Sequence, residues 1–186
     1  MELKEAIYTR RSTRNYKSEF VSDEIINELI YAGTNTPSAM NIQPWAFSVI
    51  QDRTLLQQLS DEAKEYLLDT LESRPYLESY RATFHDPEFN IFYNAPALLT
   101  IYAKPEGPNP AGDCTLAAQN VMLMAHSMGL GTCWIGFAQT FLNDPIIKER
   151  LGVPQNYTII APIIFGYPAR KSGYVQKNDP SILFWK

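Results

Sequence analysis

The spacing of hydrophobic residues predicts helices in the first third of the chain. Residues 2–9 should form a short helix and residues 23–32 a longer one, with Ser22 as its N-cap and Gly33 at its C′ position. Apolar residues recur with a helical period along residues 54–72, which predicts a third, amphipathic helix. Each of these helices should bury one apolar face.

Runs of apolar residues also predict strands, of which those at residues 97–103 and 158–166 should be buried. They occur at residues 46–50, 97–103, 132–137 and 158–166. Between them, residues 113–128 are apolar almost all round, so this helix should lie at the centre of the fold and end at Gly129. A last helix should have Asp144 as its N-cap and Pro145 at its first position, and should end at Gly152.

Other segments have no period. Residues 34–45 contain two prolines and should form an ordered loop, whereas the aromatic-rich residues 73–94 should be a mobile or lid-like segment with short helical pieces. The tail, residues 167–186, is polar until its apolar end, which must be buried against another surface, such as a second subunit. This order of helices and strands predicts a single α/β or α+β domain over residues 1–186.

The composition is that of a globular protein. The chain has 186 residues, 45% of them hydrophobic and 19% charged, which excludes a disordered or fibrous protein. Its net charge of −4, from 16 basic and 20 acidic residues, argues against a general nucleic-acid binder. The charge is uneven, however, because the stretch from Thr9 to Lys17 holds four basic residues and no acidic one. A compact basic cluster in an acidic protein therefore needs an explanation.

The sequence favours a cytoplasmic protein without membrane contact. No apolar run follows the first charged residues, so a signal peptide is not indicated. The uncharged stretches at residues 114–143 and 151–169 are interrupted by polar residues, glycines or proline, and do not supply the ~20 predominantly apolar residues of a membrane span. Cys114 and Cys133 have no C-x-x-C spacing and should be small buried side chains in a reducing cytosol.

Several kinds of catalytic site are not indicated. The sequence has no G-x-S-x-G motif, no P-loop and no cluster of metal ligands, and His85 and His126 have no evident catalytic partner. Residues 129–134, GLGTCW, begin like a dinucleotide-binding fingerprint, but Trp134 replaces the third glycine and the motif follows a helix rather than a strand. An enzyme with these side chains would need a cofactor to carry its chemistry.

Three short constellations are candidates for binding. The first is RRSTR at residues 10–14, where three guanidinium groups and two hydroxyls within five residues could saturate a phosphate with charge-assisted hydrogen bonds. A solvated basic stretch, or the target of a basophilic kinase, is the alternative interpretation of the same residues.

The other two constellations are loops. Residues 37–45, PSAMNIQPW, present Ser38, Asn41 and Gln43 between two prolines, and these groups suit the edge of a heterocycle. A well-capped turn next to a core tryptophan would have the same sequence. In CWIGF, Gly136 would let a flat ligand approach the backbone, although a tight bend at the end of a buried strand also explains it.

Four motifs occur in a fixed order along the chain. They are RRSxR from Arg10, PSxxNxQPW from Pro37, WIGF from Trp134 and GYP from Gly166. Together, over residues 2–185, they make the sequence resemble the nitroreductase family of FMN-dependent oxidoreductases. The resemblance implies an α+β fold, a three-layer sandwich with a mixed, mainly antiparallel sheet flanked by helices. It also implies an obligate homodimer with FMN at the subunit interface and a C-terminal extension onto the partner subunit.

The resemblance also implies roles for individual residues. Arg10, Arg11 and Ser12 match positions that hold the FMN phosphate and ribityl chain, and Arg14 matches a basic residue near the flavin pyrimidine edge. The loop that reaches FMN from the partner subunit is matched by Pro37, Ser38, Ala39, Asn41 and Gln43. Ile135 and Gly136 match the stretch whose backbone lies against the isoalloxazine ring, with an amide directed at N5.

The tail departs from the family pattern. Family members usually have a phosphate-binding arginine before the last apolar segment, and Lys177 is the nearest equivalent here. Lysine keeps the charge but not the bidentate fork of arginine, so Arg170 or Lys171 could substitute for it. Residues 73–94 are the nearest counterpart of a longer helical excursion over the flavin in larger members.

The implied activity is an FMN-dependent oxidation of NADH or NADPH that reduces nitroaromatics, quinones or related small-molecule acceptors in a ping-pong cycle. The flavin N5 would take the hydride, so no catalytic side chain is required. Two alternatives remain open: a non-enzymatic FMN-binding or sensing protein, and a specialised relative such as a reductive dehalogenase or a flavin-destructing enzyme.

Overall fold

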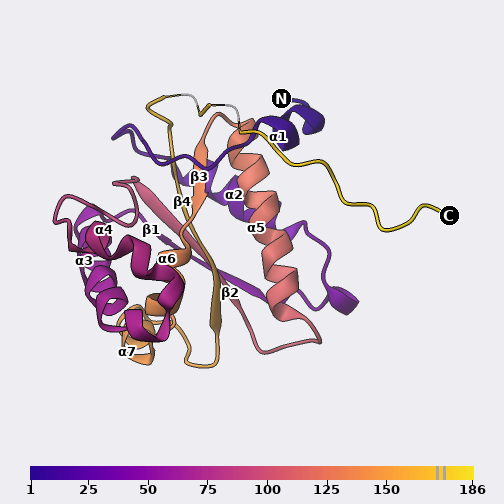
Figure 1. The fold of residues 1–186 in the computed structure, drawn as a ribbon. Coiled ribbons are helices and arrows are strands. Elements are labelled where there is room, and N and C mark those ends of the chain that lie inside the picture. The colour runs from indigo at the N-terminus through magenta and orange to yellow at the C-terminus, as the bar shows by residue number, and fades with distance from the viewer. Residues whose placement is uncertain (171, 174) are drawn as a thin grey trace.

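A four-stranded sheet forms the centre of the computed structural model, which describes residues 1–170, 172–173 and 175–186. The strands are β1 (Trp45–Ile50), β2 (Ala97–Ala103), β3 (Gly131–Trp134) and β4 (Thr158–Gly166) (Figure 1). Their order is β1–β2–β4–β3, and each neighbouring pair is antiparallel. A parallel bridge between Ser12 and Thr132 adds the basic N-terminal segment to the β3 edge.

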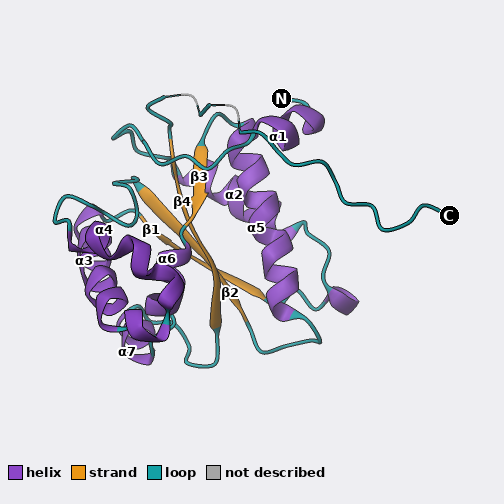
Figure 2. Cartoon of the chain, in the orientation of Figure 1, coloured by secondary structure: helices purple, strands orange, loops and turns teal. Residues whose placement is uncertain are grey.

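Helices cover both faces of this sheet, as Figure 2 shows. One face carries α1 (Leu3–Thr9), α2 (Asp23–Thr34) and α5 (Pro110–Ser127), and the other carries α3 (Arg53–Asp69), α6 (Gly136–Leu142) and α7 (Pro145–Arg150). On β2, Leu99 and Ile101 pack on the α2 and α5 side, whereas Leu98 and Tyr102 pack on the α3 and α6 side. Successive strand residues point to opposite faces, so a fully apolar strand fills two cores. The expected α+β, three-layer architecture is confirmed.

Side-chain caps explain where two of the helices begin. The Asp52 carboxylate accepts hydrogen bonds from the backbone N–H groups of Thr54 and Leu55, at 2.8 and 3.1 Å, at the start of α3. The Asp144 carboxylate accepts from the N–H of Ile146 at 2.9 Å at the start of α7, as predicted.

The predicted N-cap position of α2 is confirmed, since Ser22 directly precedes the helix, although its side chain makes no capping hydrogen bond. Two other predicted helix ends are wrong. Gly33 does not end α2; it lies within the helix, where a Cβ atom would approach Val121 Cγ2 to 3.0 Å, so its role is close packing against α5. The central helix, α5, starts at Pro110 rather than at residue 113, because the Asn109 side chain accepts from an amide of its first turn.

The strand predicted over residues 132–137 is present, but its predicted C-terminal end is wrong. β3 ends at Trp134, and Gly136 begins helix α6. The N–H of Ile135 donates to the carbonyl oxygen of Pro162 at 2.8 Å, which fixes the change of direction between strand and helix. An apolar run of six residues hid this turn because the first turn of a buried helix is as hydrophobic as a strand.

Short helices follow α3, as predicted for residues 73–94. They are the 3₁₀ turns Leu71–Ser73 and Pro75–Tyr80 and the helix α4 (Arg81–His85). Leu77 and Phe84 are buried against Leu67 and Leu71, so this segment has its own small hydrophobic core on α3. Its mobility stays a prediction.

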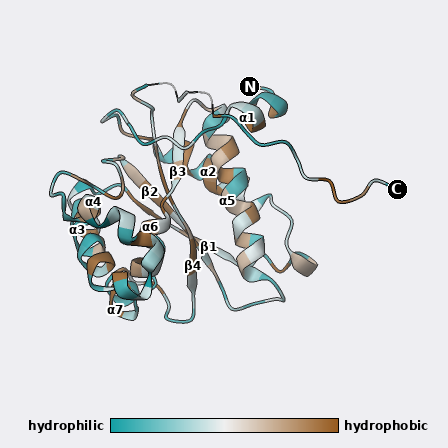
Figure 3. Ribbon diagram, in the orientation of Figure 1, coloured by the Kyte–Doolittle hydropathy of each residue, from teal (hydrophilic) through white to brown (hydrophobic). Residues whose placement is uncertain are grey.

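The last part of the tail extends away from the body of the protein, past α5 (Figure 1). Its apolar end, visible in Figure 3, is solvent-exposed: Leu183 is 90% and Trp185 89% exposed. These residues have no partner surface within the described part of one chain. None of the helices described here has both the length and the hydrophobicity needed to cross a bilayer.

Both cysteines are free and buried, as predicted. Burial raises the pKa of Cys114 to about 11 and also raises the pKa of Cys133. Both thiols therefore remain protonated at neutral pH, which makes them poor nucleophiles.

Candidate active site

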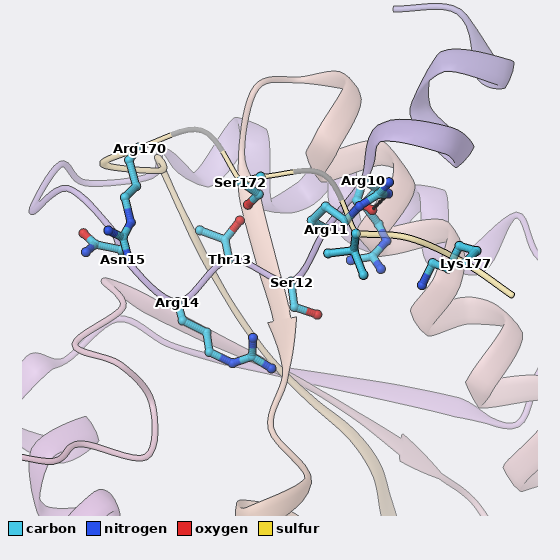
Figure 4. A pocket seen from close by; sticks show the side chains of 11 residues that line it. Arg10, Arg11, Ser12, Thr13, Arg14, Asn15, Arg170, Ser172 and Lys177 are labelled. Carbon is cyan, nitrogen blue, oxygen red and sulfur yellow. Dashed lines mark hydrogen bonds between the residues drawn. The ribbon is translucent and has the colours of Figure 1, made fainter.

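The basic N-terminal segment opens into a cavity of about 730 Å³ (Figure 4). Its walls are Arg10, Arg11, Ser12, Thr13, Arg14 and Asn15 together with Arg170, Ser172, Gly173, Val175 and Lys177 of the tail. The structure therefore brings together the four N-terminal residues that the sequence assigned to the cofactor, and adds a second cationic wall from the tail.

Two guanidinium nitrogens of this cavity are buried without a hydrogen-bond partner among the described residues. They are Nη1 of Arg10 and Nε of Arg11. The pKa of Arg10 is lowered mainly by burial and secondly by the positive charge of Arg11. An unpaired buried donor is unfavourable, and two adjacent guanidinium groups repel each other, whereas an oxyanion between them would satisfy both. The site thus has the charge and the free donors that a phosphate monoester requires.

The edge of β3 fixes the backbone of the basic segment. The N–H of Thr13 donates to the carbonyl oxygen of Thr132 at 2.9 Å, and the Tyr16 hydroxyl donates to the carbonyl oxygen of Thr13 at 2.6 Å. Burial raises the pKa of Tyr16, so this donor stays neutral. Thr13 lies over Gly131, where any Cβ atom would come within 2.6 Å of the Thr13 Cβ.

His126, on the last turn of α5, contacts Thr9, which lies next to the basic N-terminal segment. Its Nε2 lies 2.8 Å from the Oγ1 of Thr9, and that hydroxyl donates its proton to the carbonyl oxygen of Glu5 at 2.7 Å. Nε2 must therefore carry a proton and donate it to Thr9. Burial and then the nearby charge of Arg10 lower the pKa of His126, Glu5 partly opposes them, and Arg11 makes a smaller lowering contribution.

This histidine should make stability depend on pH. The pKa of His126 is near 6.5 in the unfolded chain and lower in the folded protein. Protonation therefore favours the unfolded state, and the free energy of unfolding should fall as the pH drops below about 6.5. His126→Gln, which keeps an N–H for Thr9, should flatten this dependence in urea unfolding between about pH 5 and 7.5. Parallel pH profiles for the two proteins would contradict the assignment.

A second cavity, of about 300 Å³, shares Arg14 with the first. Its other walls are Tyr80, Tyr93, Cys133, Trp134, Ile135, Gly136 and Phe137. At Gly136 no atom lies within 4 Å of where a Cβ would stand, so the backbone there is open. The rings of Tyr80 and Phe137 pack edge to face with centroids 5.1 Å apart. Ile135 and Gly136 thus border an aromatic cavity that suits a flat ligand.

The loop predicted to contact the cofactor, residues 37–43, lines neither of these cavities within one chain. It lies at the opposite end of α5 (Figure 1), where the N–H of Ala39 donates to Asp113 Oδ2 at 3.2 Å. His126, next to the arginines, is about 20 Å further along this helix at 1.5 Å per residue. The loop is therefore too far from the arginines of its own chain to contact the same ligand.

The same loop is held in an unusual backbone conformation. Met40, Asn41 and Gln43 have positive φ angles of 52°, 56° and 55°. The Oγ of Ser38 accepts from the N–H of Gln43 at 3.0 Å, and the Gln43 amide donates to the Asn41 Oδ1 at 3.1 Å. Backbone strain that is maintained by such bonds is frequent at binding sites. Pro37 and the polar ends of Asn41 and Gln43 are exposed.

The tail offers two described cations to the basic cavity. Figure 4 shows Lys177 on the side of Arg10 and Arg11, whereas Arg170 lies on the other side, beside Asn15. Lys177 therefore has the better position to share an anion with the two arginines. Lys171, the other alternative from the sequence, lies outside the described residues.

Sequence reasoning missed several residues of these cavities. Thr132 has a buried hydroxyl without a partner among the described residues, next to Ser12 on the sheet edge. Tyr80, Tyr93 and Phe137 border the aromatic cavity. None of them carries a local signal, although Phe137 follows the WIG motif directly. In the described ranges, no three or more His, Cys, Asp or Glu side chains gather as a metal site would require.

A family model described as "Nitroreductase family" matches residues 7–167. This span contains the basic segment, the loop at residues 37–43 and the WIG motif. The chain belongs to the nitroreductase family.

Individual relatives agree with this assignment. A protein of Archaeoglobus fulgidus named as an NADH dehydrogenase/NAD(P)H nitroreductase is 30% identical over 93% of this chain and 89% of its own length. The crystal structure of a nitroreductase with bound FMN from Bacteroides fragilis superposes with a TM-score of 0.83, at 27% identity, over 99% of this chain and 97% of that one. An iodotyrosine deiodinase of Nematostella vectensis is 26% identical over 91% of this chain and 68% of its own length.

Proposed function

We propose that this protein is a single-domain cytoplasmic oxidoreductase that binds FMN, takes hydride from NADH or NADPH and reduces nitroaromatics, quinones or related small molecules in a ping-pong cycle. It belongs to a family whose solved relatives include FMN-bound nitroreductases. The observation that carries the proposal is the pair of buried guanidinium nitrogens of Arg10 and Arg11, which have no partner among the described residues, in a cavity that shares Arg14 with an aromatic one.

Each part of the site has a task in this proposal. Arg10, Arg11 and Ser12, with Lys177, hold the phosphate and ribityl chain through charge-assisted hydrogen bonds. Arg14, between the two cavities, places a positive charge where the ring system would gain negative charge on reduction. Ile135 and Gly136 give the ring an open stretch of backbone. When bound, FMN supplies the two-electron chemistry that no side chain here can provide.

We also propose that the working form is a homodimer in which the loop at residues 37–43 completes the partner's site. Exposed apolar side chains gather on the face formed by α1, α2 and α5: Leu3, Ile7, Tyr8, Tyr31 and Leu116. An apolar groove of about 360 Å³ runs along the same helices. Such a face, together with an apolar tail that has no surface in its own chain, favours association of two copies.

Removal of the apolar end should break this dimer. Deletion of residues 181–186 removes Leu183 and Trp185, which are almost fully exposed in one chain. Size-exclusion chromatography with light scattering at micromolar protein should show a shift toward monomer, together with loss of FMN. Deletion of Lys186 alone is the matched control and should leave the dimer intact. A wild-type monomer that retains FMN would refute the shared site.

The function itself is tested by the absorbance spectrum of the purified protein, followed by anaerobic titration with NADH and with NADPH. A flavin spectrum that one of the nucleotides bleaches, and that a nitroaromatic or quinone restores, is the expected result. A protein without flavin that also fails to bind added FMN would sink the proposal. A flavoprotein that no reductant bleaches would instead be a binding or sensing protein.

The deiodinase relative favours one second candidate, reductive dehalogenation. The aromatic cavity bordered by Tyr80, Tyr93 and Phe137 would accept a halogenated phenol as well as a nitroaromatic. Halide release from iodophenols by the chemically reduced protein, measured with an ion-selective electrode, separates the two. No halide release alongside rapid nitro reduction would exclude it.

A further inference from the structure

Arg14 is common to three neighbouring cavities, yet little in its own chain holds it. It lines the basic cavity, the aromatic cavity and a third of about 280 Å³. Its side chain is exposed, and no carboxylate among the described residues lies within ion-pair distance of it. The contact that the structure provides is the ring of Tyr93, whose centroid lies 5.7 Å from the Arg14 guanidinium carbon.

The backbone of Tyr93 is strained. Tyr93 and Asn94 both adopt left-handed conformations, with φ angles of 53° and 52°. Such a conformation is uncommon for a bulky residue, and two in succession persist only where the surroundings impose them. An observed strain of this kind, beside two cavities, calls for a functional reason.

Three hydrogen bonds of Asn90, one of them to α3, hold the turn that leads to Tyr93. Asn90 is buried, donates to the Oε1 of Gln57 at 2.8 Å, and accepts at its Oδ1 from the N–H of Phe92 at 2.8 Å. Its carbonyl oxygen accepts from the N–H of Tyr93 at 2.8 Å. The side chain and the backbone carbonyl group of Asn90 therefore both hold the turn that precedes Tyr93.

The ring of Tyr93 has a second aromatic neighbour. Phe89 meets it edge to face, with centroids 5.8 Å apart and an interplanar angle of 88°. No hydrogen bond of the Tyr93 hydroxyl is present among the described residues, so the ring face is the group that acts on Arg14. A guanidinium over an aromatic face is held by the negative quadrupole of the ring, and no anionic partner cancels its electrostatic field, as a carboxylate would in an ion pair.

We propose that Tyr93 is a positioning residue for Arg14, and that it thereby sets how much more tightly the protein binds reduced than oxidised flavin. The inference rests on the proposed function. Reduced flavin carries more negative charge than oxidised flavin, so a cation held in one place stabilises the reduced form more. A guanidinium that samples many rotamers in water gives less of this stabilisation. The neutral ring fixes Arg14 without cancelling its field.

The test uses the two-electron midpoint potential of the FMN-loaded protein, since a merely structural contact would not move it. Tyr93→Asn removes the ring but tolerates a positive φ, so its backbone can stay in place. We expect reduced FMN to lose about 3–10-fold in affinity relative to oxidised FMN, which corresponds to a potential lower by about 15–30 mV. Tyr93→Phe keeps the ring face and should stay within about twofold of wild type, or about 9 mV.

A double-substitution series tests whether Tyr93 acts on the potential through Arg14. In Arg14→Gln protein, a further Tyr93→Asn change should leave the potential where Arg14→Gln alone puts it. An unchanged potential in Tyr93→Asn, an equal loss in Tyr93→Phe, or a Tyr93 effect that survives without Arg14 would each overturn the proposal. Titration of the wild-type apoprotein with FMN comes first. If FMN does not bind, the proposed function fails, whereas normal FMN binding with any of these three outcomes refutes only the role of Tyr93.

Discussion

Arg10→Ala protein should lose most of its FMN during purification while it folds like the wild type. Nη1 of Arg10 is buried without a partner among the described residues, so the side chain contributes a charge to the cavity and no internal hydrogen bond through that atom. A hydrogen bond to a charged group is worth about 1.5–3 kcal/mol. The dissociation constant for FMN should therefore rise about 10–150-fold, as measured by quenching of flavin fluorescence.

Arg11→Ala should weaken FMN binding by a similar factor but should also cost some stability. Nη1 of Arg11 donates to the carbonyl oxygens of Tyr8 and Arg10, at 2.9 and 2.7 Å, and so closes the end of α1. Lys17→Ala is the matched control, because Lys17 belongs to the same basic stretch but pairs with Glu19 at 3.1 Å, outside the cavity. FMN affinity that is unchanged in both arginine variants, or lowered equally by Lys17→Ala, would refute the phosphate assignment.

The basic segment is the part of the site that a local sequence motif predicts best. Arg10, Arg11, Ser12 and Arg14 are neighbours in sequence, and one short bridged segment at the edge of β3 presents them together. The sequence alone is therefore enough to predict that these side chains lie together. Likewise, strands β2 and β4 have the predicted bounds, because a strand buried on both faces is a continuous apolar run.

Other parts of the site depend on contacts that no local pattern contains. His126 is far from Thr9 in sequence, and so is Tyr93 from Arg14, whose guanidinium it contacts from a turn held by a hydrogen bond between Asn90 and Gln57 of α3. The start of α6 was missed for a related reason, since its first turn is as apolar as the strand before it. The loop at residues 37–43 lines neither cavity of its own chain, so its proposed role depends on a second copy that a local pattern does not describe.

Substitution by alanine at Gly131 and at Gly136 should have different effects on stability, although both changes should weaken FMN binding. At Gly131 the new Cβ would lie 2.6 Å from the Cβ of Thr13, an atom that no change of rotamer can move away. Thr13 is buried and bonded to Thr132, so the clash must shift the backbone of the basic segment. Overpacking of this kind costs about 1–3 kcal/mol. Gly131→Ala should therefore lower both the free energy of unfolding and the affinity for FMN.

At Gly136 the new methyl group meets no atom of the chain within 4 Å, and alanine favours the first turn of α6 by up to about 1 kcal/mol. Gly136→Ala should thus leave the unfolding of the apoprotein unchanged or slightly harder, and yet weaken FMN binding, because the methyl group occupies the side of the aromatic cavity that a flat ring would use. Urea unfolding and FMN titration of both variants separate the two effects. Gly136→Ala protein that binds FMN as tightly as wild type would show that the ring does not lie against this backbone.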